Sequence, residues 1–207
     1  MTTPRRTIRL LLADDQALVR GALTALLNLE PDLDVVSEVG TGDAVVPAVL
    51  EHRPDVALLD VEMPGLDGIS ATAAVRAAAP ETKVLIVTTF GRPGFLRRAL
   101  QAGASGFVVK DTPASQLADA VRRIHQGLRV VDPALAMDSL SLGESPLTER
   151  ETEVLRAASD GAAVATIAGR VHLSPGTVRN HLSAAIGKTG AANRSEAVVI
   201  ATANGWL

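Results

Sequence analysis

The sequence predicts an α/β fold, a doubly wound parallel sheet of five strands, followed by a small all-α domain of four helices. Over residues 1–126, short apolar runs alternate with segments of helical periodicity, which is the pattern of parallel strands joined by crossover helices. The runs are apolar throughout rather than at alternate positions, as expected for strands buried on both faces. After residue 147 the periodicity is helical only, so a second, helical domain is expected there.

Each predicted strand is a short apolar run, and each predicted helix is the amphipathic stretch that follows it. The strands are expected at 8–13, 34–39, 55–60, 83–89 and 105–110. The helices are expected at 16–29, about 43–52, 68–79, 93–102 and 114–126. Residues 127–146 contain Gly, Pro and Ser without a steady period, so we expect a linker with room for a short helix in its middle.

The expected second domain, residues 147–207, contains a helix, a tight turn and a further helix in close succession. Its four helical patterns lie at 148–160, 163–170, 175–187 and 194–204. The segment VHLSPG separates the second from the third, with Ser174 as the expected N-cap and Pro175 at the first helical position. This arrangement is the helix-turn-helix pattern.

Composition excludes several classes of protein. With 47% hydrophobic and 21% charged residues, the chain has the balance of a globular protein, and no apolar run approaches the roughly 18–20 residues that span a bilayer. The absence of cysteine excludes disulfides, thiolate zinc sites and cysteine nucleophiles, and a cytoplasmic location without membrane contact is the default. The net charge is −3, yet residues 147–207 carry six Lys and Arg against five Asp and Glu, so nucleic acid is expected to bind there.

Polar side chains gather where the predicted strands end. Asp14 and Asp15 follow the first strand, Asp60 closes the third, Thr88 ends the fourth and Lys110 follows the fifth. Ligands of open α/β sheets bind at this edge. Three carboxylates in one crevice repel one another unless a cation intervenes, and Mg²⁺ is the hard divalent ion that suits oxygen ligands. A lysine there can pair with a phosphoryl group, and a threonine hydroxyl can donate to it.

In order and spacing, ADD, LLDVEMPGLDG, VTTF and GFVVKD resemble the flavodoxin-like receiver domain of two-component response regulators. The resemblance implies that Asp60 accepts a phosphoryl group from a sensor histidine kinase and forms an aspartyl-phosphate. It implies that Asp14, Asp15 and Asp60 hold Mg²⁺ together with the backbone carbonyl of Glu62.

By the same resemblance, Lys110 contacts the phosphoryl group, and Thr88 and Phe107 form the pair that repacks on phosphorylation. Each residue alone has a plain structural alternative: a helix N-cap for Asp14 or Asp15, a strand-end cap for Asp60, a solvated charge for Lys110. Their joint occurrence in one alternating pattern favours a phosphorylation site over these structural alternatives.

Two enzyme classes fit poorly. A haloacid-dehalogenase-type phosphatase needs its two aspartates two residues apart after one strand, whereas Asp14 and Asp15 are adjacent. The segment GTGD at 40–43 is similar to a dinucleotide-binding loop, but it lacks the third glycine and follows the second strand, so a turn is expected. Beyond transferring phosphate to its own aspartate and hydrolysing it there, the chain is expected to catalyse no reaction.

The stretch from PLTERETEVL through SPGTVRNHL to the end resembles a LuxR/NarL-type DNA-binding domain. The whole chain is therefore similar to NarL/FixJ-family response regulators, and VTTFGRPGF and NGWL resemble the DesR-like subgroup. Arg179 and Asn180 are expected to read guanine and adenine, and Ser183 shares their helix face. Thr177, Lys188 and Arg170 are expected to contact phosphates.

The resemblance implies a transcription factor that dimerises and binds promoter DNA when Asp60 is phosphorylated. Helices one and five, or helices four and five, would form the dimer interface, and the sequence does not choose between them. The helix before the turn, AAVATIAGRV, lacks the lysine usual in this family. With so little positive charge, one domain is expected to bind DNA poorly, so paired half-sites are needed. A phosphorylation-independent DNA-binding or scaffolding protein with a silent receiver is the alternative from another class.

Overall fold

The computed structural model describes residues 7–89, 93–132, 135–137 and 145–207. The chain forms two compact units, the first over Met1–Gly91 and Leu96–Ala136 and the second over Arg92–Phe95 and Met137–Leu207. None of the helices in the described ranges is long and apolar enough to cross a membrane.

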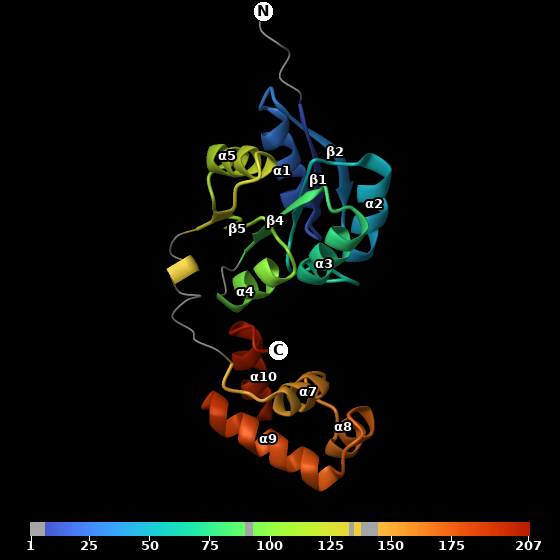
Figure 1. Cartoon of the computed structure of the whole chain (residues 1–207), viewed down its shortest axis with the longest axis vertical. Coiled ribbons are helices and arrows are strands. Elements are labelled where there is room, and N and C mark those ends of the chain that lie inside the picture. The colour runs from blue at the N-terminus through green and yellow to red at the C-terminus, as the bar shows by residue number, and fades with distance from the viewer. Residues whose placement is uncertain (1–6, 90–92, 133–134, 138–144) are drawn as a thin grey trace, which may run out of the picture. The chain divides into compact units, whose positions relative to one another are not determined.

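A parallel sheet forms the centre of the first unit, in the strand order β2-β1-β3-β4-β5-β6. Its strands are β1 (Ile8–Ala13), β2 (Leu33–Val39), β3 (Val56–Leu59), β4 (Lys83–Thr88), β5 (Gly106–Val109) and β6 (Val130–Val131). The connecting helices are α1 (Ala17–Asn28), η1 (Gly42–Ala44), α2 (Val45–His52), α3 (Gly68–Ala78), α4 (Pro93–Gln101) and α5 (Ala114–His125). The pair α1 and α5 covers one face and the pair α2 and α3 the other (Figure 1). The doubly wound fold is confirmed.

The continuous apolar runs follow from burial on both faces. Leu10 and Leu12 of β1 point into the core under α1 and α5, together with Leu58 and Leu85 of the neighbouring strands. Leu11 lies between them and points to the opposite face, yet it is equally inaccessible to solvent. Because both faces are covered, the sequence shows no alternation of apolar and polar residues along this strand.

The sheet has a sixth strand where five were predicted, and the difference lies in the segment expected to be linker, 127–146. Gly127, with a φ of +87°, ends α5 and turns the chain back so that Val130 pairs with Gly106 of β5. A Cβ on Gly106 would lie 2.7 Å from the carbonyl oxygen of Val130, so the close pairing requires glycine. A two-residue strand is too short to give a periodic pattern, so the sequence does not predict it.

The second unit consists of α7 (Glu149–Ala157), α8 (Val164–Arg170), α9 (Pro175–Thr189) and α10 (Arg194–Ala203). Ser174 caps α9 by accepting a hydrogen bond from the Thr177 N–H (3.1 Å), and Pro175 opens the helix, which confirms both predictions. Val178, Leu182 and Ala185 of α9 are buried in one core with residues of α7 and α8. The opposite side of α9 is left exposed.

Candidate functional site

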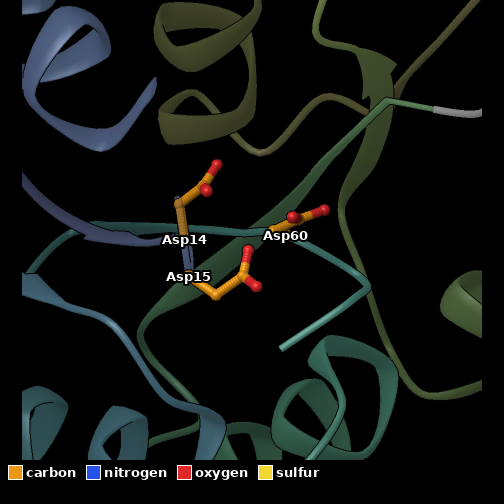
Figure 2. Close-up of side chains that lie close together, drawn as sticks. All are labelled: Asp14, Asp15 and Asp60. Atoms are coloured by element: carbon orange, nitrogen blue, oxygen red, sulfur yellow. The ribbon is translucent and has the colours of Figure 1, made fainter. Parts of the chain in front are cut away.

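The predicted carboxylates meet between β1 and β3, which are neighbours although another strand separates them in sequence. Ala13 and Leu59 pair in register, and the Asp60 N–H donates to the Ala13 carbonyl (2.9 Å). Asp14 and Asp60 therefore leave the sheet side by side. Figure 2 shows them with Asp15, and carboxylate oxygens of all three lie within 4.8 Å of one another. Strand order reverses between β1 and β3, the point where such sheets bind ligands.

Lys110 joins two of the carboxylates. Its Nζ lies 2.6 Å from Oδ2 of Asp14 and 2.8 Å from Oδ2 of Asp60. The other carboxylate oxygen of each aspartate also accepts a hydrogen bond. Asp14 Oδ1 accepts from the Gln16 N–H (2.9 Å), and Asp60 Oδ1 accepts from the Val61 N–H (2.7 Å). Asp14 thus belongs to the turn that begins α1 as well as to the cluster.

Burial and charge oppose each other in this cluster. Asp14 and Asp60 are only 2% and 4% exposed, and burial raises the pKa of Asp60 above its usual value, with Asp14 adding to the rise and Lys110 opposing it. Burial alone would lower the pKa of Lys110, but hydrogen bonds to Asp14 and Asp60 outweigh it, so this pKa is raised. The ammonium therefore stays charged at neutral pH.

The donor set suits a hard divalent cation. Three carboxylates face one ammonium, so the ionised cluster keeps an excess of negative charge that a second cation would offset. Asp15 is exposed, and its carboxylate has no hydrogen bond or ion pair within the described residues. Glu62 lies two positions after Asp60 with its side chain exposed, and no described contact brings its carbonyl into the cluster.

The other two predicted residues of this site are buried nearby. Thr88 ends β4 and is 2% exposed, and Phe107 of β5 is fully buried. Phe107 pairs with Ile86 rather than with Thr88, so the two lie at different levels of the sheet. Sequence reasoning missed Arg20 of α1, which donates to the Asp14 carbonyl (2.5 Å) and pairs with Glu38. No local pattern marks this arginine, because its partners lie on β2 and at the end of β1.

Of the six residues predicted to contact DNA, three lie free on the surface of α9. Arg179, Asn180 and Ser183 are exposed, and Arg179 has no ion-pair partner within the described residues. Thr177 is half-buried, and its hydroxyl lies 2.8 Å from that of Ser174. Arg179, Asn180 and Ser183 are therefore the predicted DNA contacts that are exposed on α9, the helix that follows the turn.

The two other predicted contacts, both cations, hold helices of the second unit together. Lys188 Nζ lies 2.7 Å from Oε2 of Glu151 on α7, and the same carboxylate accepts the Thr148 N–H (2.7 Å) as part of a capping box. Arg170 pairs with Asp160 at 2.7 Å and donates to a carbonyl of α7. Their charges are thus partly neutralised within the unit.

Comparison with known proteins agrees with the family resemblance predicted for each of the two domains. The model of the response regulator receiver domain matches residues 10–122, and that of the bacterial regulatory proteins of the luxR family matches residues 145–201. The uncharacterized transcriptional regulatory protein YvfU of Bacillus subtilis (strain 168) is 42% identical over 97% of this chain and 100% of its own length. The transcriptional regulatory protein DesR of the same strain is 40% identical over 97% and 99%.

A solved structure agrees as well. The response regulator ChrA of a heme-sensing two-component system is 35% identical, with a TM-score of 0.58 over 95% of this chain and 96% of that one. Fold, site and relatives define a response regulator with a receiver domain and a LuxR-type DNA-binding domain. The chain belongs to the NarL/FixJ family of two-component response regulators, as its sequence motifs predicted. Both YvfU and DesR are named as transcriptional regulatory proteins.

The variant Glu151→Gln is expected to destabilise the second unit by roughly 1 kcal/mol at neutral pH, since glutamine retains the cap but loses the ion pair with the part-exposed Lys188. The charged partner and the cap hold the pKa of Glu151 below its usual 4.5, against the opposing effect of burial. In the wild type this stabilisation is complete above pH 4.5 and is lost as pH falls through the lower pKa of the folded state.

The difference in unfolding free energy between wild type and Glu151→Gln should therefore disappear in acid. Denaturant unfolding followed by fluorescence measures it, because the single tryptophan, Trp206, is partly buried and packs against the core of this unit. A difference that stayed constant from pH 7 into acid would show that the charge of Glu151 contributes nothing.

Proposed function

We propose that this response regulator is switched by transfer of a phosphoryl group from a sensor histidine kinase to Asp60, with Mg²⁺ as the cofactor. One observation supports the proposal above all others: carboxylates that follow two neighbouring strands converge on one ammonium group at the carboxyl edge of the sheet. A purely structural cluster would not need Asp15, which is exposed and unpaired within the described residues.

The chain supplies the nucleophile and a fixed positive charge. A carboxylate oxygen of Asp60 attacks the phosphorus of the kinase phosphohistidine, a P–O bond forms, and the P–N bond breaks with its electrons leaving on the imidazole nitrogen. Lys110, held 2.8 Å from Asp60, opposes the rise that burial causes in the pKa of that carboxyl and offers a charged donor to the incoming oxygens. The same site would transfer phosphate from small donors and hydrolyse its own aspartyl-phosphate.

Asp14, Asp15, Asp60 and the Glu62 carbonyl are the groups proposed to hold Mg²⁺. When bound, the ion would neutralise charge between the carboxylates and the phosphoryl oxygens. Asp14 and Asp60 are already held by hydrogen bonds from Gln16 and Val61, so they would need little reorganisation to act as ligands.

Phosphorylation is proposed to act on the rest of the chain through β4 and β5. Both Thr88 and Phe107 are buried, so moving the threonine hydroxyl toward the phosphate requires the surrounding core to repack. Packed cores change between discrete arrangements rather than continuously. Such a change would alter the surface of α4 and α5 and favour a homodimer.

The phosphorylated dimer is proposed to bind promoter DNA through α9. Arg179 and Asn180 are suited to hydrogen-bond base edges in a major groove, and Ser183 lies on the same exposed side of the helix. Since the cations Lys188 and Arg170 are ion-paired within the unit, nonspecific attraction to phosphate would be weak. Two half-sites on a two-fold dimer would then be needed for tight binding.

Incubation of the full chain with acetyl phosphate and Mg²⁺ is expected to add one phosphoryl group, and Asp60→Asn is expected to add none, because an amide is not a nucleophile for this transfer. Intact-mass spectrometry measures both. A wild type of unchanged mass, or an Asp60→Asn variant labelled as fully, would contradict the proposal and favour a phosphorylation-independent DNA-binding protein.

Replacing Arg179 by Ala is expected to weaken binding to cognate DNA by about 1–3 kcal/mol and to relax the preference at one base pair, because a bidentate contact with guanine is lost. Fluorescence anisotropy with cognate and scrambled duplexes measures both effects. The control is Arg156→Ala, which removes the same charge from an exposed position on α7 and should affect both duplexes alike. Equal effects of the two substitutions would contradict base reading by Arg179.

A further inference from the structure

The segment GTGD, residues 40–43, packs against the loop that follows Asp60. We call residues 61–67 the phosphoacceptor loop. Because β2 lies beside β1 in the sheet, the chain leaving β2 emerges at the edge where the carboxylates meet. Gly42 is buried there, and its N–H donates to the carbonyl of Pro64 (3.1 Å).

The contact at Gly42 leaves no room for a side chain. A Cβ on this residue would lie 1.6 Å from the carbonyl oxygen of Leu66 and 2.5 Å from its carbonyl carbon. Gly42 is not among the glycines with a positive φ, so its backbone conformation is open to any residue. Close approach of two backbone segments, rather than the shape of a turn, is therefore what requires glycine.

Further close approaches hold the phosphoacceptor loop in the same way. A Cβ on Gly68 would lie 1.8 Å from the carbonyl oxygen of Asp60, and the Gly68 N–H donates to the Val61 carbonyl (3.0 Å). Gly65, with a φ of +77°, lies against the Asp43 carboxylate, whose Oδ2 would be 1.8 Å from a Cβ there. The loop is thus held between Asp60's own backbone and residues 40–43.

We infer that Gly42 is a positioning residue for the phosphorylation site, and this inference rests on the proposed function. By letting residues 40–43 dock on Pro64–Leu66, it fixes the path of the chain immediately after Asp60, including the Glu62 carbonyl offered to Mg²⁺. Groups that orient metal ligands without touching the metal matter because small displacements of a ligand weaken binding.

The test is the variant Gly42→Ala in the full chain, compared with the wild type. The added methyl must displace the phosphoacceptor loop, so the Kd for Mg²⁺ measured by calorimetry should rise by about tenfold or more. In ¹⁵N spectra the amide signals of residues 61–63 and 65–68 should move, and phosphorylation by acetyl phosphate at subsaturating Mg²⁺ should slow in proportion.

Two controls separate positioning from general loss of stability. Gly21→Ala adds the same methyl on α1, where nothing lies within 4 Å, and should leave the Kd for Mg²⁺ unchanged. Val121→Ala removes packing from the fully buried side of α5, so it should lower the melting temperature without changing that Kd. If Gly42→Ala lowered the melting temperature but bound Mg²⁺ as tightly as the wild type, the inference would be overturned.

If Gly42→Ala does not fold, the variant Pro64→Gly replaces it. This substitution makes the exposed part of the same loop more flexible without adding an atom. It should also weaken Mg²⁺ binding, and an unchanged Kd would overturn the inference. If the proposed function itself were wrong, the result would be different: the wild type would neither bind Mg²⁺ nor accept phosphate.

Discussion

The contact of the Lys110 ammonium with the buried carboxylates of Asp14 and Asp60 is the interaction on which the proposed chemistry of this chain depends. Without it, two carboxylates with almost no access to solvent would repel each other with no nearby positive charge to offset the repulsion. With it, each of the two has a positively charged partner, whereas Asp15 is exposed and has no such partner within the described residues. Three carboxylates thus face one ammonium, and this imbalance of charge is what supports the proposed Mg²⁺ site.

That arrangement constrains the sheet around it. The carboxylates can converge only because β1 and β3 are neighbours in space, and the Asp60 N–H is anchored to β1 through the Ala13 carbonyl. Lys110 reaches them from the end of β5, where its own N–H donates to the Thr88 carbonyl (2.8 Å). Three strands therefore fix the geometry of the site, while the loops supply exposed groups such as Asp15 and Glu62.

The sequence predicted the features that local patterns encode. Strands buried on both faces leave continuous apolar runs, and the polar residues that end them, such as Asp60 and Lys110, stand out by contrast. Helix caps such as Ser174 are also local. The structure extends this prediction by showing the carboxylates close together, whereas the roles in metal binding and phosphoryl transfer remain proposals.

The features that the sequence could not predict are contacts between distant segments. Strand β6 pairs over two residues only, and the docking of Gly42 depends on a loop more than twenty positions away. The ion pairs of Lys188 with Glu151 and of Arg170 with Asp160 join different helices or their ends, so no spacing rule reveals them. Cations that a motif assigns to DNA can thus serve partly to hold the domain together.

The central claim is that the carboxylates form a site for a divalent cation, and hydrogen exchange of the β1 and β3 amides measured against Mg²⁺ concentration tests it most directly. Binding to the folded state should raise the free energy of opening, by about 2.7 kcal/mol at a hundred times the Kd. Sodium chloride at matched ionic strength should not do so. Exchange rates in β1 and β3 that were unaffected by Mg²⁺ would contradict the account.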